Sequence, residues 1–292
     1  MFHGVITALV TPFRDGKIDD NAFREHLNRQ IESGVDAVVV AGSTGEAATL
    51  SFDEHKALIK SAIEEASGRI PVIAGTGSNC TRESIELSQA ARHLGADAAL
   101  LISPYYNKPT QEGIYLHYKA IADAVHLPLI TYSVPGRTAS DVLPSTLGRL
   151  AKISNIVGHK DATGDMAVLT AILNETAGNI ELYSGDDGTL MPFMALGGSG
   201  VISVLSNILP QHLKDVIAHI EREDLKKARI CHQQLAKINE AMFIRSNPIP
   251  VKAACALLGW MQDELRLPLT SLDDEARVFL KKEMTSLGCF SI

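Results

Sequence analysis

Ile156-Val-Gly-His-Lys-Asp-Ala-Thr-Gly-Asp165 is a short apolar run that ends on a lysine and passes into a glycine-containing turn. Such a run predicts a buried strand, and the C-terminal end of a barrel strand is where reactive groups collect. Burial there would lower the pKa of Lys160, because desolvation disfavours the ammonium form, and a neutral amine can form a Schiff base with a carbonyl. Taken alone, the stretch favours the plainer alternative of a solvated charge at a strand end.

Strand-like apolar runs alternate with amphipathic segments on both sides of this stretch. Strands are predicted at residues 5–10, 37–40, 71–74, 98–102, 127–132, 156–160, 180–184 and 200–204. The helices that follow them are predicted at residues 21–33, 52–66, 82–94, 111–124, 144–151, 166–174, 189–196 and 210–222. Eight such units with continuous apolar strands predict an α/β protein of the (β/α)8 TIM barrel class.

A doubly wound open sheet is the structural alternative. It fits less well, because Gly75-Thr76-Gly77 supplies only part of the GxGxxG signal that would close its first strand. After residue 223 the strands stop, and helices are predicted at residues 224–242, 250–258 and 273–287. We therefore expect a catalytic barrel over residues 1–223 and a C-terminal helical appendage over residues 224–292.

Composition narrows the possible partners of the chain. Of its 292 residues 46% are hydrophobic and 21% are charged, which is typical of a globular protein. The formal net charge of -7 argues against a nucleic-acid-binding surface, so small molecules are the expected partners. The four cysteines are scattered and the ten histidines show no ligand spacing, which favours reduced thiols and predicts no metal site.

Two segments bear on localisation. The N-terminal Met-Phe-His-Gly-Val-Ile has no basic region followed by a long apolar segment, so we expect no secretory signal and a cytoplasmic protein. Residues 188–213 lack Asp, Glu, Lys and Arg and could suggest a membrane span. Prolines and glycines, among them Pro192, Gly197 and Pro210, interrupt this stretch, so we predict no contact with a membrane.

Polar residues follow other predicted strands and could join Lys160 at the same face of the barrel. The Gly42–Gly45 loop, Gly-Ser-Thr-Gly, offers backbone N–H groups that can hold a carboxylate, although an ordinary glycine turn has the same composition. Tyr132 and Tyr106 each carry a hydroxyl suited to proton transfer, and Arg137 offers a planar fork for a carboxylate. Taken singly, a structural tyrosine or a surface ion pair is the more frequent role.

The combination of four spaced motifs resembles a known family. These are Gly-Ser-Thr-Gly-Glu at 42–46, Pro-Tyr-Tyr-Asn-Lys-Pro at 104–109, Tyr-Ser-Val-Pro-Gly-Arg-Thr at 132–138 and Gly-His-Lys-Asp-Ala-Thr-Gly at 158–164. The chain resembles the pyruvate-dependent class I aldolase family almost from end to end. Within that family it is similar to the branch that condenses pyruvate with L-aspartate 4-semialdehyde in the diaminopimelate pathway to lysine.

The resemblance implies a role for each matching residue. Lys160 would form the Schiff base with pyruvate, so no metal or organic cofactor would be needed. Tyr132 would carry the proton, relayed through Ser43 and through Tyr106 of a neighbouring subunit in a homotetramer. The remaining substrate-binding positions implied by the resemblance are Thr44, Arg137, Gly185 and Ile202. The backbone amides of Ser43 and Thr44 would hold the pyruvate carboxylate, and Arg137 would bind the carboxylate of the semialdehyde. Gly185 and Ile202 would line the pocket.

A lysine feedback site is also implied, at positions matched here by His55, Asn79, Glu83 and Tyr105. Two further positions depart from the inhibited bacterial pattern, with Ala47 for serine and Phe52 for histidine, so inhibition by lysine stays open. Two departures concern the barrel mouth itself. Ser43 replaces the more usual threonine, which keeps the hydroxyl but loses a restraining methyl group, and Asp161 replaces glutamate after the lysine.

Two alternatives remain beside this expectation. One is another aldolase or lyase of the same family, an N-acetylneuraminate lyase or a keto-sugar-acid aldolase or dehydratase, which typically lacks the Tyr-x-Val-Pro-x-Arg-Thr motif seen at 132–138. The other is a barrel retained as a binding or regulatory protein without catalysis. Activity on pyruvate and aspartate semialdehyde would separate all three.

Overall fold

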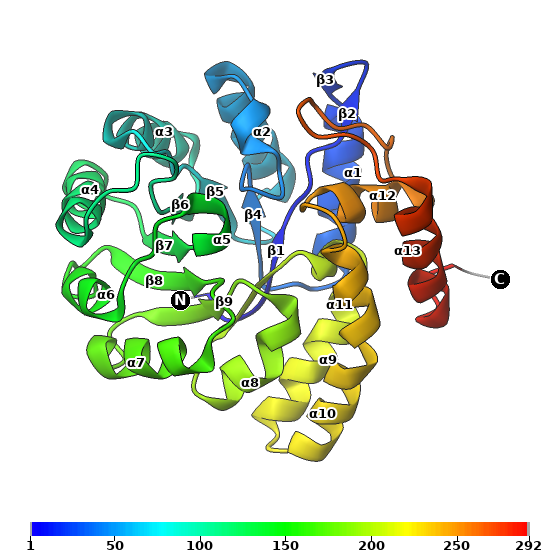
Figure 1. The fold of residues 1–292 in the computed structure, drawn as a ribbon. Coiled ribbons are helices and arrows are strands. Elements are labelled where there is room, and N and C mark those ends of the chain that lie inside the picture. The colour runs from blue at the N-terminus through cyan, green and yellow to red at the C-terminus, as the bar shows by residue number, and fades with distance from the viewer. Residues whose placement is uncertain (1, 291–292) are drawn as a thin grey trace.

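A computed structural model describes residues 2–290 and contains a closed barrel of parallel strands. Figure 1 shows the strands surrounded by helices, with the C-terminal helices gathered at one side. The barrel strands are β1 (Gly4–Ala8), β4 (Ala37–Val40), β5 (Val72–Gly75), β6 (Ala98–Ile102), β7 (Leu129–Ser133), β8 (Ile156–Asp161), β9 (Glu181–Ser184) and β10 (Gly200–Ser203). Each barrel strand pairs with the next barrel strand along the chain, and β1 closes the ring against β10. The predicted (β/α)8 class is therefore confirmed.

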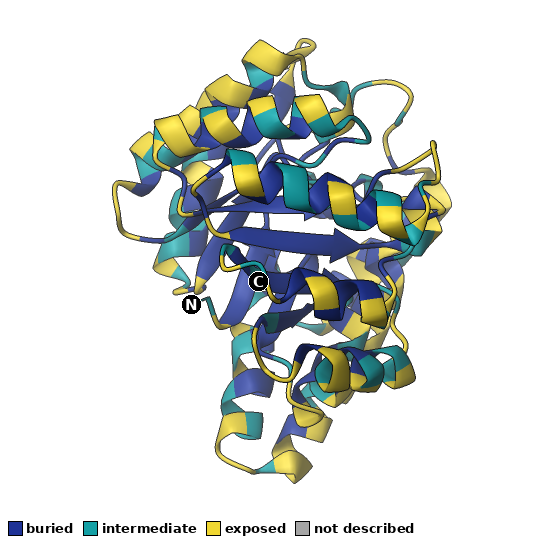
Figure 2. Ribbon diagram, turned by 90° about the vertical axis from the view of Figure 1, so that its left-hand side faces the viewer, coloured by how far each residue is buried: buried dark blue, intermediate teal, exposed yellow. Residues whose placement is uncertain are grey.

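The helices of the barrel cover the outer face of the strands. They are α1 (Asp20–Glu32), α2 (Phe52–Ala66), α3 (Thr81–Leu94), α4 (Gln111–Ala124), α6 (Pro144–Leu150), α7 (Met166–Thr176), α8 (Leu190–Ala195) and α9 (Pro210–Glu221). Figure 2 shows their outward faces exposed and their inward faces and the strands buried. Helix α2 begins at a capping box, in which the Ser51 hydroxyl accepts from the Glu54 N–H and the Glu54 carboxylate accepts from the Ser51 N–H.

The strands divide their side chains between two apolar layers. Inside the barrel lie alternate residues such as Ile6, Val39 and Ile130, whereas Val38 and Val40, the neighbours of Val39 in β4, pack outward against the helices. Both layers are buried, which explains why the strands read as continuous apolar runs in the sequence.

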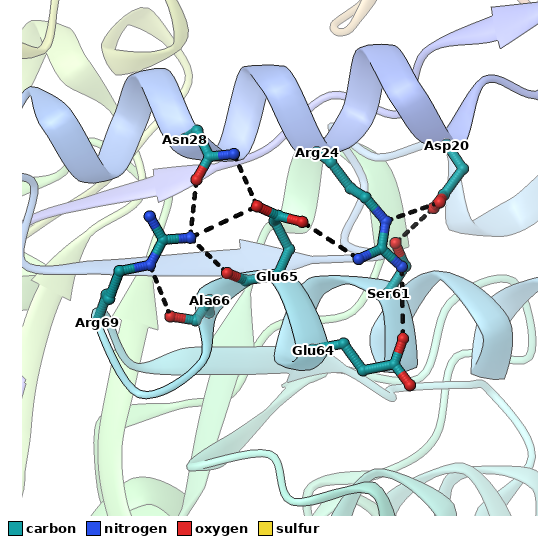
Figure 3. A network of polar contacts seen from close by, with 8 residues as sticks. All are labelled: Asp20, Arg24, Asn28, Ser61, Glu64, Glu65, Ala66 and Arg69. Atoms are coloured by element: carbon teal, nitrogen blue, oxygen red, sulfur yellow. Dashed lines mark hydrogen bonds and ion pairs between the residues drawn. The ribbon is translucent and has the colours of Figure 1, made fainter.

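Ion pairs connect the outer helices α1 and α2. Figure 3 shows Arg24 of α1 between Asp20 and two glutamates of α2, with its Nε 2.8 Å from an Asp20 oxygen and its Nη1 3.2 Å from Glu65 Oε2. Asn28 donates to the other oxygen of Glu65 at 2.7 Å. Most of these groups are partly exposed, so we regard the network as a surface contact between two helices, with a small effect on stability.

The structure corrects several predicted elements. The helix expected over 224–242 is two helices, α10 (Leu225–Gln234) and α11 (Ala236–Met242), joined at Leu235. The tail continues with α12 (Ile249–Leu257) and α13 (Asp274–Ser286), close to the predicted bounds. Short elements that the periodicity did not show are β2 (Phe13–Arg14), β3 (Lys17–Ile18), α5 (Pro135–Thr138), η1 (Ala47–Thr49), η2 (Asp187–Thr189) and η3 (Leu205–Asn207).

The tail shares its core with the barrel. Buried residues of α11, α12 and α13, among them Ile238, Val251 and Leu280, belong to the same apolar cluster as Val5 of β1. The division at residue 223 stays a prediction, since one continuous cluster spans it. Among residues 2–290 no helix has both the length and the hydropathy that a membrane crossing requires.

Candidate active site

Lys160 lies inside the mouth of the barrel, near the C-terminal end of β8. Strict alternation along β8 would have placed it outside, because Ile156 packs in the outer layer with Leu129. The pairing of β7 with β8 shifts register at this point, so that Leu129 faces Ile156 but Ile130 faces Gly158. The extra residue, Val157, reverses the faces that follow, and Lys160 therefore points inward beside its register partner Tyr132.

The space for the Lys160 side chain comes from Gly185, which directly follows the neighbouring strand β9. A Cβ added at Gly185 would lie 2.9 Å from Lys160 Cε and 2.7 Å from the Cβ of Ala162. The Gly185 N–H donates to the Asp161 carbonyl at 2.7 Å, which holds the two strand ends together. Gly185 therefore allows the lysine side chain to pass, and any larger residue there would displace it.

Burial changes the acid–base properties of Lys160. Its side chain is only 6% exposed, and desolvation lowers the pKa of the amine to about 8, opposed by the negative charge of Asp187 and assisted by the positive charge of Arg137. The amine lies 4.3 Å from the ring centroid of Tyr132. A substantial neutral fraction at physiological pH follows, which is what a nucleophilic amine requires.

Tyr132 is also buried, and desolvation raises the pKa of its phenol to about 12. The hydroxyl therefore stays protonated throughout the neutral range and can act as a proton donor. Its strand, β7, places it next to Lys160 through the register pair Tyr132–Lys160. One acid and one base thus lie side by side on adjacent strands.

A cavity of about 870 Å³ opens over these two side chains. The predicted site residues that line it are Ser43, Thr44, Tyr132, Arg137, Lys160 and Gly185. They come from the ends of β7 and β8, from the loops after β4 and β9 and from the short helix α5, so the barrel does bring these distant positions together. Residues 2–290 contain no group of three or more His, Cys, Asp or Glu side chains placed to hold a metal ion.

Two predicted residues lie elsewhere. Ile202 is fully buried inside the barrel in the same apolar layer as Ile6 and Tyr132 and is not among the residues that line the cavity, so its expected part in the Schiff-base pocket stays a prediction. Tyr106 is 88% exposed and does not reach the cavity of its own chain, so its expected part in a neighbouring subunit's site stays a prediction.

The proposed lysine site is continuous with the cavity in the single chain. His55, Glu83 and Tyr105 line the cavity, as do the departing positions Ala47 and Phe52. Asn79 does not line it, but its Nδ2 donates to the Tyr105 carbonyl at 3.1 Å. The His55 ring hydrogen-bonds the Gly75 carbonyl at 2.7 Å, and burial lowers its pKa.

Sequence reasoning missed what the tail contributes to this site. Asn247 donates through Nδ2 to the Thr44 hydroxyl at 2.9 Å, and its carbonyl accepts from Arg137 Nη2 at 2.9 Å. One buried residue between α11 and α12 thus joins the loop after β4 to the arginine after β7. The Asn-Pro-Ile-Pro-Val-Lys motif at 247–252 was visible in the sequence, but nothing in it showed that it faces the barrel mouth.

Comparison with known proteins agrees with this geometry. Residues 1–287 match the model of the dihydrodipicolinate synthetase family. A 4-hydroxy-tetrahydrodipicolinate synthase of Pelobacter propionicus is 49% identical over 288 residues, covering 99% of each chain. The chloride-inhibited dihydrodipicolinate synthase of Acinetobacter baumannii, solved with pyruvate, superposes with a TM-score of 0.97 at 48% identity, over 99% of this chain and 100% of that one. A lysine-bound enzyme from Cyanidioschyzon merolae superposes with a TM-score of 0.96 at 40% identity, over 99% of each chain.

Proposed function

The chain belongs to the dihydrodipicolinate synthetase family, and we propose that it catalyses the 4-hydroxy-tetrahydrodipicolinate synthase reaction, the condensation of pyruvate with L-aspartate 4-semialdehyde. The observation that carries the proposal is Lys160, a buried amine of lowered pKa at the mouth of the barrel. The relative from Pelobacter propionicus has this activity as its name, and the enzyme from Acinetobacter baumannii was solved with pyruvate.

In the proposed reaction the neutral amine of Lys160 attacks the keto carbon of pyruvate, one proton is taken up and water leaves, which gives an iminium ion on the lysine. Loss of a proton from the methyl carbon then yields an enamine, because the iminium nitrogen accepts the electron pair. The enamine carbon attacks the aldehyde of the second substrate, whose oxygen takes up a proton. Cyclisation through the amino group of that substrate releases the lysine.

The side chains around the amine support these steps. Tyr132, protonated at neutral pH, would supply and recover the proton, with the hydroxyl of Ser43 as the next member of the relay. The backbone N–H groups of Ser43 and Thr44 would hold the pyruvate carboxylate. Arg137, fixed by the Asn247 carbonyl at the rim of the cavity, would bind the carboxylate of the semialdehyde.

Borohydride reduction in the presence of pyruvate tests the covalent step. We expect one adduct per chain, located on the peptide that contains Lys160, and none with Lys160→Ala. Lys252 provides an internal control, because it is also buried but is paired with Glu46 and absent from the cavity lining. An intact protein without an adduct on Lys160 would refute the Schiff-base mechanism.

Substrate choice is tested separately. Turnover with pyruvate and aspartate semialdehyde, and none with N-acetylneuraminate or keto-sugar acids, is the expected result. Arg137→Ala should raise the KM for the semialdehyde far more than the KM for pyruvate, because only the former carboxylate would contact the guanidinium. A selective rise in the pyruvate KM would reassign this arginine.

Tyr106 supports a proposal about assembly. We infer a homotetramer in which this exposed tyrosine completes the proton relay of a neighbouring subunit, since it does not line the cavity of its own chain. Mixing two inactive variants, Tyr106→Phe and Lys160→Ala, under conditions of subunit exchange should restore part of the activity. No recovery from mixed oligomers verified by mass spectrometry would contradict the shared site.

Lysine is proposed as a regulatory ligand of the region around His55, Glu83 and Tyr105. The Glu83 carboxylate, held by the Ser78 hydroxyl at 2.7 Å, is suited to an ammonium group. Ala47 and Phe52 remove two polar side chains from the inhibited pattern, so we expect weaker inhibition than in relatives that carry serine and histidine there. Isothermal titration calorimetry of wild type and of the variant Glu83→Gln with L-lysine would test this site.

A further inference from the structure

Glu46 and Lys252 form an ion pair whose two side chains are both fully buried. The Lys252 amine lies 2.6 Å from Glu46 Oε1, and neither side chain has measurable exposure. The second oxygen, Oε2, accepts from the Arg266 N–H at 3.2 Å, so both oxygens of the carboxylate are used. The Lys252 amine also lies 4.3 Å from the ring centroid of Phe13.

Stability alone is a poor reason for such a pair. Removing two charges from water costs about as much as their attraction returns, and apolar replacements of similar volume are often neutral or stabilising. The partners are separated by 206 positions in the chain, one in the loop after β4 and the other in α12 of the tail. This pair therefore fixes the position of the loop relative to the tail.

The loop in question is the one that carries Ser43 and Thr44. Glu46 closes a tight turn, because its N–H donates to the Ser43 carbonyl at 3.2 Å and the Ala47 N–H donates to the Gly42 carbonyl at 3.2 Å. Its backbone is in the left-handed region, with φ of 55°, which is unfavourable for a glutamate unless surrounding contacts impose it. The buried bonds of its own side chain to Lys252 and to the Arg266 N–H are contacts of this kind.

We propose that Glu46 and Lys252 are positioning residues for the pyruvate carboxylate. The ion pair holds the turn 43–46 so that the backbone N–H groups of Ser43 and Thr44 face the cavity, while neither charged group takes part in the chemistry. The tail thus acts on the first substrate through one buried contact. This inference rests on the proposed function, in which those N–H groups bind the carboxylate.

Glu46→Gln tests the proposal with little change of volume, and Lys252→Met removes the partner charge. We expect the KM for pyruvate to rise about tenfold in either variant, since a loop displaced by a fraction of an ångström misaligns the bound carboxylate. The KM for aspartate semialdehyde should change less than twofold. Hydrogen exchange at the amides of residues 42–47 should become faster.

Leu280→Ala serves as the control, because this fully buried side chain of α13 lies in the tail core and its truncation lowers stability through a cavity. We expect it to lower Tm without changing the pyruvate KM. A Glu46→Gln variant that loses Tm as Leu280→Ala does, but keeps its pyruvate KM within twofold of wild type and its loop exchange unchanged, would overturn the proposal. Should Lys252→Met fail to fold, Glu46→Gln decides alone.

The same experiment separates this inference from the proposed function. If wild-type protein forms no borohydride adduct with pyruvate, the proposed function fails and the positioning role has no substrate to act on. Adduct formation can also be measured as a function of pyruvate concentration. If wild type forms the adduct and both variants show the same dependence on pyruvate concentration as wild type, the positioning role alone is wrong.

Discussion

The pH dependence of Schiff-base formation gives the sharpest test of the site. An exposed lysine has a pKa of about 10.5, whereas burial lowers that of Lys160 to about 8. At pH 7 the neutral fraction then rises from about 0.03% to about 9%, a gain of about 300-fold. The rate of adduct formation should therefore increase about tenfold per pH unit below pH 7 and level off above pH 8 to 9.

The assay is the initial rate of trapped adduct at subsaturating pyruvate without the second substrate, measured from pH 6 to 10.5. Tyr132, with a pKa of about 12, keeps its proton over this range, so no falling limb is expected from it. Without the semialdehyde, Arg137 has no substrate carboxylate of its own to bind, so it affects the measured rate only through its charge near the Lys160 amine.

Two variants should move the midpoint in opposite directions. Arg137→Met removes a positive charge that lowers the pKa of Lys160, so the midpoint should rise, whereas Asp187→Asn removes a negative charge that raises it, so the midpoint should fall. Lys152→Met, at an exposed position, is the control and should leave the profile unchanged. A wild-type midpoint at or above pH 10 would refute the buried-amine reasoning, as would the absence of any shift in both charge variants.

The other predictions concern single side chains at the mouth of the barrel. Gly185→Ala should lower the rate of adduct formation by about 10²-fold, because the added Cβ would lie 2.9 Å from Lys160 Cε. The control Gly113→Ala on α4 should leave the rate unchanged. A wild-type rate in Gly185→Ala would show that the lysine can move aside. Lys160→Met should stabilise the fold by up to about 3 kcal/mol at pH 7, because the native wild-type chain holds this lysine at a pKa of about 8 instead of 10.5. Between pH 8 and 10.5 the unfolded wild-type chain binds more protons than the native one, so the stability of wild type rises with pH. Urea unfolding should therefore show the advantage of the variant shrinking towards pH 10.5. Tyr132→Phe should retain the adduct but slow turnover by about 10²-fold or more, and a wild-type rate would exclude the tyrosine as proton carrier.

Much of the architecture could be predicted because the barrel repeats one simple unit. Strands buried on both faces give continuous apolar runs, and the helices between them have one apolar side, so the eight strand–helix units follow from periodicity. The errors occur where elements are too short to show a period. The two-residue strands β2 and β3 are an example, and so is the break at Leu235, where an ordinary helix-forming residue separates α10 from α11.

The site was predictable in part for a different reason. In a parallel barrel every strand presents its C-terminal end to the same face, so Ser43, Tyr132 and Arg137 could be expected near Lys160 from chain order alone. The contributions of the tail could not be, because no local pattern tells that Asn247 reaches Thr44 or that Lys252 pairs with Glu46. Such contacts depend on how the tail packs across the barrel mouth.

The sequence by itself determined that Lys160 ends a buried strand of a barrel and that its neighbours carry compatible chemistry. It did not determine which face of the strand the lysine occupies, because a strand that is apolar on both faces has no polar alternation to show it. The tertiary structure decided this through the register shift beside Val157, which reverses the parity after Ile156 and places Lys160 inside. With that one shift the amine enters the mouth of the barrel beside Tyr132, where burial lowers its pKa into the range in which an amine can react.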